Sequence, residues 1–185
     1  DLHSTSRRQR QMCKETVGQS FRLPAAFDTL TWYGKGPWET YADRKDAALI
    51  GLYTSSVAEQ HVPFAVPCEC GGHEDTRFAA LSDGTHTVQI VGSDDFHFSA
   101  LPYSIAEYRK ATYEEELPEQ TTGTWLILDA AHAGLGGDTG WTKNIHPEYR
   151  DAREDTAIRS VSISHKRKNR PTAYWILTEQ ITDFS

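Results

Sequence analysis

The sequence lacks any long hydrophobic run and has fewer basic than acidic residues. No stretch approaches the roughly 18 consecutive apolar residues that a membrane-spanning helix requires, so we expect a soluble domain with no membrane partner. Its 19 basic residues are outnumbered by 26 acidic ones, and the net charge of −7 disfavours a nucleic-acid partner, whose binding needs a net basic face. This charge favours a neutral small molecule or another protein as the partner.

Cysteine is scarce, and the three thiols do not suggest a disulfide framework. Cys68, Cys70 and His73 are close enough in sequence to suggest a metal site. However, the second pair of ligands that a structural zinc site requires is missing. We therefore expect buried or inert thiols and no metal.

The chain also lacks the common catalytic motifs and a secretion signal. It contains no G-x-S-x-G, no H-E-x-x-H and no G-x-x-x-x-G-K-[ST]. A glycoside hydrolase needs two carboxylates facing the scissile bond, yet no spacing places two of Glu39, Asp43, Glu69 and Asp138 on one rigid element. Residues 1–18 have no apolar signal core and no initial Met, so we expect a flexible polar leader in a piece of a longer protein, with cytoplasm or periplasm left open.

What the sequence does have is material for one β-rich domain, which we place at residues 19–185. Each sheet in such a domain must bury its apolar face, which predicts an all-β fold, a large antiparallel two-sheet β-sandwich with one short helix. Alternating or short apolar runs predict strands at residues 21–24, 27–33, 76–81, 85–92, 96–101, 124–129 and 172–181.

Two local signals define a turn and a helix start. Asp83-Gly84 between alternating runs predicts a hairpin. Ser104 followed three residues later by Glu107 predicts a capping box, and the helix should fray or end early at residues 114–116, because glutamates are unfavourable at a helix C-terminus. We further expect an ordered loop at 37–57 with one helical turn at 43–48, an extended edge at 61–67 and a turn at 93–95. Residues 151–170 are polar and charged, and their basic run at 166–170 favours a solvated connection or turn. His86 and His97 are expected to be ordinary strand histidines.

The strongest functional signal lies in residues 126–149. This stretch begins as an apolar strand, breaks into a glycine-rich loop and presents Trp141 just after Asp138. An indole beside a carboxylate suits a sugar, whose C–H face can stack on the ring while its hydroxyls find acceptors. The alternative is that Trp141 closes the end of the core and that the glycines only turn the chain.

Three segments carry a family resemblance. They are residues 30–45 (LTWYGKGPWETYADRK), 59–81 (EQHVPFAVPCECGGHEDTRFAAL) and 128–149 (LDAAHAGLGGDTGWTKNIHPEY). Their order and spacing resemble the signature stretches of the C-terminal domain of glycoside hydrolase family 2 β-galactosidases, which is also found in the small subunit of two-chain enzymes. The resemblance implies an antiparallel sandwich similar to the galactose mutarotase supersandwich. It also implies that the catalytic glutamates lie in a separate TIM-barrel domain, so we expect no catalytic residue in this chain.

The resemblance also implies roles for single residues. In the motif G-G-D-x-x-W, Trp141 would form a platform for the sugar at the active site of the barrel, while Gly136 and Gly137 would shape the loop. Asp138 would either contact the sugar or hold the loop by accepting backbone N–H groups. The implied partners are a β-galactoside in the intact enzyme and the rest of the chain or a large subunit, with a homo-oligomer left open. We expect no cofactor here, since any Mg²⁺ or Na⁺ of such enzymes would lie in other domains.

Departures from the family pattern leave the preferred galactoside open. Cys68 and Cys70 stand where the common P-Q-E-N-G has amide side chains, and Tyr113 stands where histidine is common. Gly140 precedes Trp141 where the family has serine, which gives the backbone more freedom. A stand-alone carbohydrate-binding module is the alternative from another class. An independent mutarotase-like epimerase would need a His/Glu pair that the sequence does not make evident.

Overall fold

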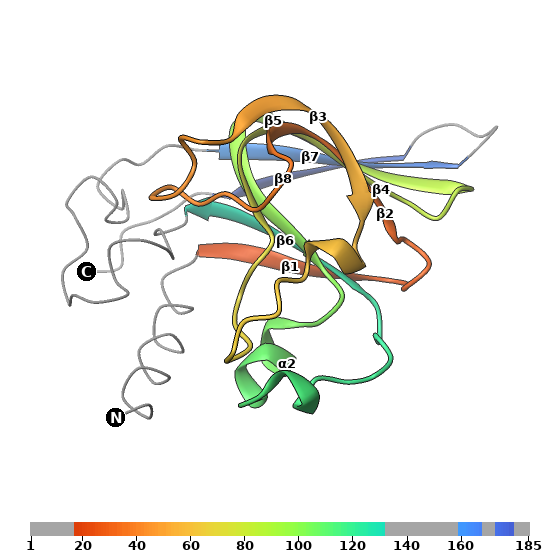
Figure 1. Cartoon of the computed structure of the whole chain (residues 1–185). Coiled ribbons are helices and arrows are strands. Elements are labelled where there is room, and N and C mark those ends of the chain that lie inside the picture. The colour runs from red at the N-terminus through yellow and green to blue at the C-terminus, as the bar shows by residue number, and fades with distance from the viewer. Residues whose placement is uncertain (1–16, 132–158, 168–172, 180–185) are drawn as a thin grey trace, which may run out of the picture.

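The computed structural model describes residues 17–131, 159–167 and 173–179 (Figure 1). Its elements, in chain order, are β1 (Val17–Leu23), β2 (Thr29–Gly36), β3 (Leu49–Ser56), the 3-10 helix η1 (Ala58–Gln60), β4 (Gly72–Ser82), β5 (His86–Leu101), α2 (Ile105–Lys110), the 3-10 helix η2 (Glu114–Glu116), β6 (Thr124–Ala131), β7 (Arg159–Arg167) and β8 (Ala173–Glu179).

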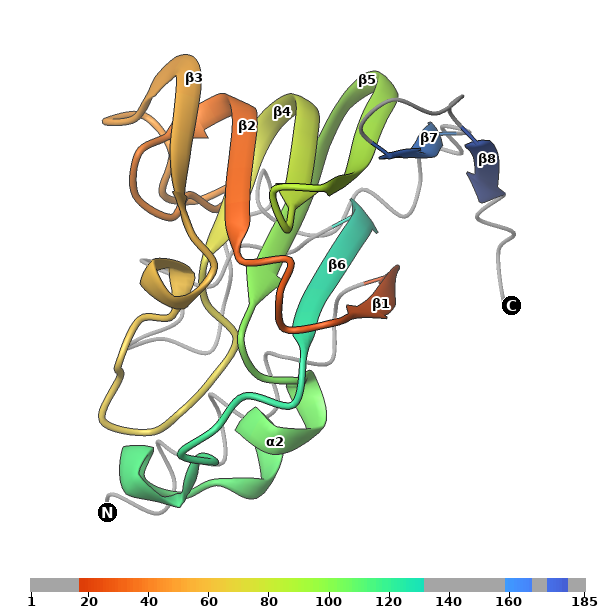
Figure 2. The same cartoon turned by 90° about the vertical axis from the view of Figure 1, so that its right-hand side faces the viewer.

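The eight described strands join one antiparallel sheet, shown from a second direction in Figure 2. Its main path runs β1-β6-β5-β4-β2-β3, and β7 and β8 branch from β5. Along one edge of β5, residues 86–92 pair with β7 and residues 97–101 pair with β6. The prediction of an all-β antiparallel fold with one short helix is confirmed, and the arrangement is consistent with a β-sandwich.

One face of the sheet, which we call the inner face, carries the main core. Alternate residues of each strand point to it, as the pleat requires, so Leu126 and Leu128 of β6 lie in this core while Ile127 between them does not. Leu30 and Phe98 in the same core are fully buried. The core also contains Phe27, Trp32, Val57, Ala79, Leu81, Ile90, Phe96 and Ala100.

The opposite, outer face of the sheet has a second and smaller core beneath α2. Leu101 and Ile127 pack there against Tyr108 of the helix. The predicted capping box is confirmed, because the Ser104 hydroxyl accepts the Glu107 N–H at 3.1 Å and the Glu107 carboxylate accepts the Ser104 N–H at 2.7 Å. The helix ends at Lys110, ahead of the glutamates, as expected. Among the described residues, no helix has the length and apolarity needed to cross a membrane.

The hairpin between β4 and β5 is also confirmed. Gly84 takes a φ of +84°, a conformation that favours glycine. Asp83 Oδ1 accepts the backbone N–H groups of Thr85 and His86 at 2.8 and 2.6 Å. These local bonds fix the register of the two strands.

Four other predictions of local structure are wrong. Residues 43–48 form turns and one isolated bridge, between Tyr41 and Arg44, and no helical turn. Residues 49–56 form strand β3, paired in register with β2, in a stretch for which we expected an ordered loop. The polar residues 93–95 lie inside β5 and form no separate turn, since the strand continues there while its partner changes from β7 to β6. Residues 159–167, a polar stretch in which we predicted no strand, form β7. In these last three cases, pairing with another strand overrides the local pattern.

Candidate functional site

The candidate site lies where two loops meet at one end of β4 and β5. The loop between β2 and β3 contacts the start of β4 through backbone bonds, with the Thr40 N–H donating to the Gly72 carbonyl at 2.7 Å. Glu39 Oε2 accepts the Gly71 N–H at 2.9 Å, and its other oxygen binds Arg44. The first two segments of the family resemblance are thus joined in space.

Two adjacent glycines make this close approach possible. Gly71 has a φ of +66°, and a Cβ there would lie 2.6 Å from the Gln60 carbonyl oxygen. A Cβ on Gly72 would lie 2.4 Å from His97 Nε2 and 2.8 Å from the Tyr41 ring. Any larger residue at either position would push the loops apart.

A buried histidine and aspartate join this point to β6. His97 and Asp129 are cross-strand partners on the outer face, and Nδ1 lies 2.7 Å from Oδ2. Their side chains are 5% and 0% exposed, so His97 donates to the carboxylate in a nearly water-free setting. Asp129 lies two residues before the end of β6 at Ala131, after which the chain enters residues 132–158. This pair fixes the strand end from which the glycine-rich segment departs.

Tyr41 completes the cluster above the His97 ring. Its ring centroid lies 5.5 Å from that of His97, and its hydroxyl accepts the Gly72 N–H at 3.2 Å. Burial, followed by the charges of Glu69 and Glu39, raises the pKa of Tyr41 well above its ordinary value. The phenol therefore stays neutral and serves as a fixed hydrogen-bonding group.

A second polar cluster ties the neighbouring loop to α2 and η2. His61 Nδ1 lies 2.8 Å from the Tyr108 hydroxyl, and Nε2 lies 2.5 Å from Glu114 Oε1. The Cys70 thiol donates to the Tyr108 hydroxyl at 3.7 Å. Burial raises the pKa of Cys70 to about 11, so the sulfur is protonated near neutral pH and is not an activated nucleophile.

This second cluster bears on two predictions. A His/Glu pair does exist at His61 and Glu114, which sequence reasoning missed because the residues are far apart in the chain. The two side chains are bonded to each other, whereas an epimerase needs an acid and a base that both reach a substrate.

Cys70 and His73 have different partners, since His73 Nε2 lies 2.6 Å from Gln60 Oε1. Within the described ranges, no three potential ligands are grouped for a metal ion.

The predicted site residues lie outside the described residues. Trp141, Asp138, Gly136 and Gly137 all belong to residues 132–158. What the structure does describe is the end of β6, where Asp129 contacts His97 of the loop cluster. Sequence reasoning treated His97 as an ordinary strand histidine and did not single out Asp129, although an acid that ends an apolar strand signals a buried partner.

Known proteins match most of the chain. The family described as the β-galactosidase small chain matches residues 3–161. A β-galactosidase of Priestia megaterium is 39% identical over 134 residues, which are 72% of this chain and 13% of that protein. A β-galactosidase of Vibrio cholerae is 40% identical over 133 residues (72% and 12%), and β-galactosidase 2 of Enterobacter cloacae is 41% identical over 133 residues (72% and 12%). The matched part is thus about an eighth of the length of these relatives.

Proposed function

Because this chain belongs to the β-galactosidase small-chain family, we propose that it is an accessory domain of a β-galactosidase that completes the sugar site of a separate catalytic domain. In this proposal the domain packs on the catalytic barrel and supplies Trp141 as a platform for the substrate. The observation that carries it is the match over residues 3–161, which includes the whole glycine-rich segment.

The geometry of the described residues supports this role. A ring that binds substrate from a loop needs a rigid base, because a small misplacement removes the stacking contact. Here the base is the end of β6, where Asp129 is bonded to His97 and the loops at Glu39 and Gly71 are joined. Asp138, Gly136 and Gly137 would then shape the loop between this base and the indole.

The use of the carboxylates supports an accessory role. Glu39 binds Arg44 and the Gly71 N–H, and Asp129 binds His97. Each is engaged in holding elements together, whereas a glycosidase needs an acid and a nucleophile or base directed at the sugar. We therefore propose that hydrolysis depends on carboxylates outside this chain.

The test replaces Trp141 in the intact β-galactosidase. Trp141→Ala should lower kcat/KM for a β-galactoside by an amount equivalent to about 1 to 3 kcal/mol, the range for a lost stacking ring, and Trp141→Phe should restore part of it. Tyr113→Ala, which removes an exposed ring beside η2, is the matched control and should change little. Unchanged kinetics in Trp141→Ala would contradict the platform role.

The isolated chain provides an independent check on the class of function. It should not hydrolyse a chromogenic β-galactoside, and turnover that depends on Glu39 or Glu69 would contradict the accessory role. It should bind galactose only at about millimolar concentration or worse, since one ring with few partners gives little affinity. Micromolar binding would instead favour a stand-alone carbohydrate-binding module.

A further inference from the structure

The outer face carries a row of exposed apolar side chains at the end of the sheet away from α2. Leu52 of β3 is opposite Tyr33 of β2, Tyr33 is opposite Phe78 of β4, and Phe78 is opposite Val91 of β5. Leu52 is 67% exposed, Tyr33 and Val91 are each 42% exposed, and Phe78 is partly exposed. We call these four residues the apolar row.

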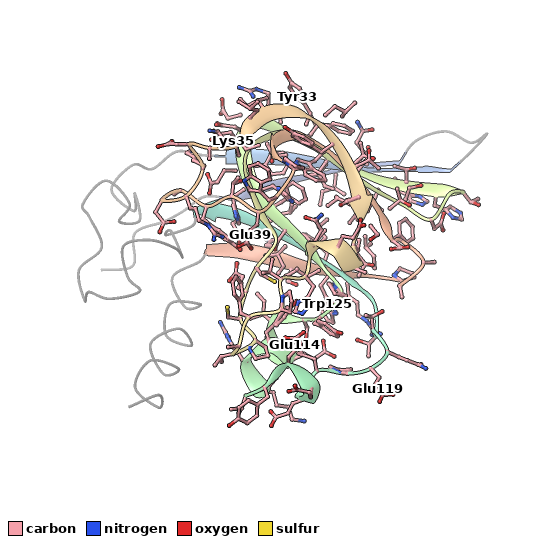
Figure 3. The ribbon with its side chains drawn as sticks, viewed as in Figure 1. Tyr33, Lys35, Glu39, Glu114, Glu119 and Trp125 are labelled. Atoms are coloured by element: carbon pink, nitrogen blue, oxygen red, sulfur yellow. The ribbon has the colours of Figure 1, made fainter. Side chains whose placement is uncertain are left out.

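The apolar row differs from scattered surface hydrophobics, which are normal in soluble proteins. Its members are neighbours on four adjacent strands, so the row crosses roughly 14 Å of sheet at about 4.8 Å per strand. Ile50, which is 45% exposed and opposite Lys35, extends it along β3. Figure 3 shows Tyr33 at the opposite end of the molecule from Glu114, which lies beside α2.

The charged neighbour of the row on β2 is engaged elsewhere. Lys35 is next to it on the same face, but its ammonium donates to the Lys45 carbonyl at 2.8 Å and lies 3.9 Å from Asp75. Its side chain is only 15% exposed. The row itself contains no charged side chain, so the surface that covers it should be apolar and largely uncharged.

We propose that the apolar row, with Ile50, is the surface by which this domain packs against the remaining polypeptide of a β-galactosidase. The inference rests on the proposed accessory function and adds to it the face used. The matched part is about an eighth of each relative, so most of such an enzyme lies outside this chain. A neighbour in the same polypeptide is present at high effective concentration, whereas a second copy must be found by diffusion.

The test measures thiol accessibility in the intact β-galactosidase. Leu52→Cys and Val91→Cys probe two ends of the apolar row, and Tyr113→Cys is the control at an exposed position beside η2. A maleimide reagent is applied to native and denatured enzyme, and peptide mass mapping separates the new thiol from Cys13, Cys68 and Cys70. Both row cysteines should react at least about tenfold more slowly in the native enzyme than in the denatured one, while the control should differ by less than about threefold.

The outcomes separate this inference from the proposed function. Leu52→Cys reacting as fast as Tyr113→Cys would overturn the docking face, and so would protection that disappears when dilution separates enzyme copies, because that result identifies a second copy as the cover. Neither result depends on Trp141. Loss of substrate binding in Trp141→Ala with a freely reactive Leu52→Cys would leave the accessory function in place and remove only this surface.

Discussion

The two ends of the outer face are built from the same kinds of residue but differ in what covers them. At one end Ile127, Leu101 and His97 are 3%, 0% and 5% exposed beneath α2 and the loops. At the other end Leu52 and Tyr33 are 67% and 42% exposed. Since apolar side chains occur at both ends, their burial is determined by the available neighbours and not by strand sequence alone.

At the covered end, specific local contacts hold α2 and the loops against the sheet. The six-residue helix α2 depends on its capping box, and the loops depend on close approach at Gly71 and Gly72. Together they cover this end of the sheet, including residues of β6. Among the described residues, no helix or loop covers the open end in this way, which suits a surface that a neighbouring domain completes.

The largest expected effect compares a residue from each end of the outer face. Ile127→Ala should lower the free energy of unfolding by about 3 kcal/mol, because it leaves a cavity under α2. Leu52→Ala should change it by less than about 0.5 kcal/mol, because the side chain is already in water. Urea denaturation of the chain measures both, and similar losses would remove the contrast between the two ends.

A smaller effect is expected from the buried polar pair at the covered end. Asp129→Ala leaves the His97 N–H without its acceptor and should cost about 2 kcal/mol of unfolding free energy. Asp94→Ala, which removes an exposed acid from β5, should cost less than about 0.5 kcal/mol. If the two variants unfold at the same urea concentration, the pair does not stabilise the base of the segment.

Acid should lower the free energy of unfolding through His73, which is enclosed in the fold and lies outside the apolar row. Burial lowers the pKa of His73 from its ordinary value of 6.5 to about 3, so between these values the unfolded chain binds a proton that the folded chain excludes. This contribution to stability is fully present above pH 6.5 and falls by about 1.4 kcal/mol per pH unit as the pH drops toward 3. Urea unfolding at pH 7 and 5.5 measures the slope.

Two replacements test this pH dependence. His73→Gln should reduce the slope, since no imidazole then remains at the buried position. Gln89→Asn, at a partly buried position of β5 without an ionisable side chain, is the control and should leave the slope unchanged. A slope that is equal in His73→Gln and the unmodified chain would assign the acid sensitivity to another group.

The features predictable from sequence are those encoded by neighbouring residues. Asp83 and Gly84 form their turn with bonds to residues two and three positions away, and Ser104 and Glu107 cap a helix within one turn. The strand at residues 124–129 was also predictable, because a strand packed on both faces is apolar throughout.

The features that were missed depend on distant partners. Leu49 and Leu52 of β3 are exposed, so this strand shows no simple alternation between buried apolar and exposed polar residues. His97 and Asp129 are 32 positions apart and meet only through the register of β5 and β6. The three segments of the resemblance could be found in the sequence, but the contact between the first two, at Glu39 and Gly71, required the structure.

Strand β5 also imposes an order on assembly as the chain is synthesised. Residues 86–92 emerge long before β7, and residues 97–101 emerge before β6, so one edge of β5 waits for two later partners. Among the described strands, β7 and β8 are synthesised after all the others, and they pair with the rest of the sheet only through this edge of β5. Until β7 has been synthesised, residues 86–92 of β5 have unpaired backbone N–H and C=O groups along this edge, and another strand could pair with them.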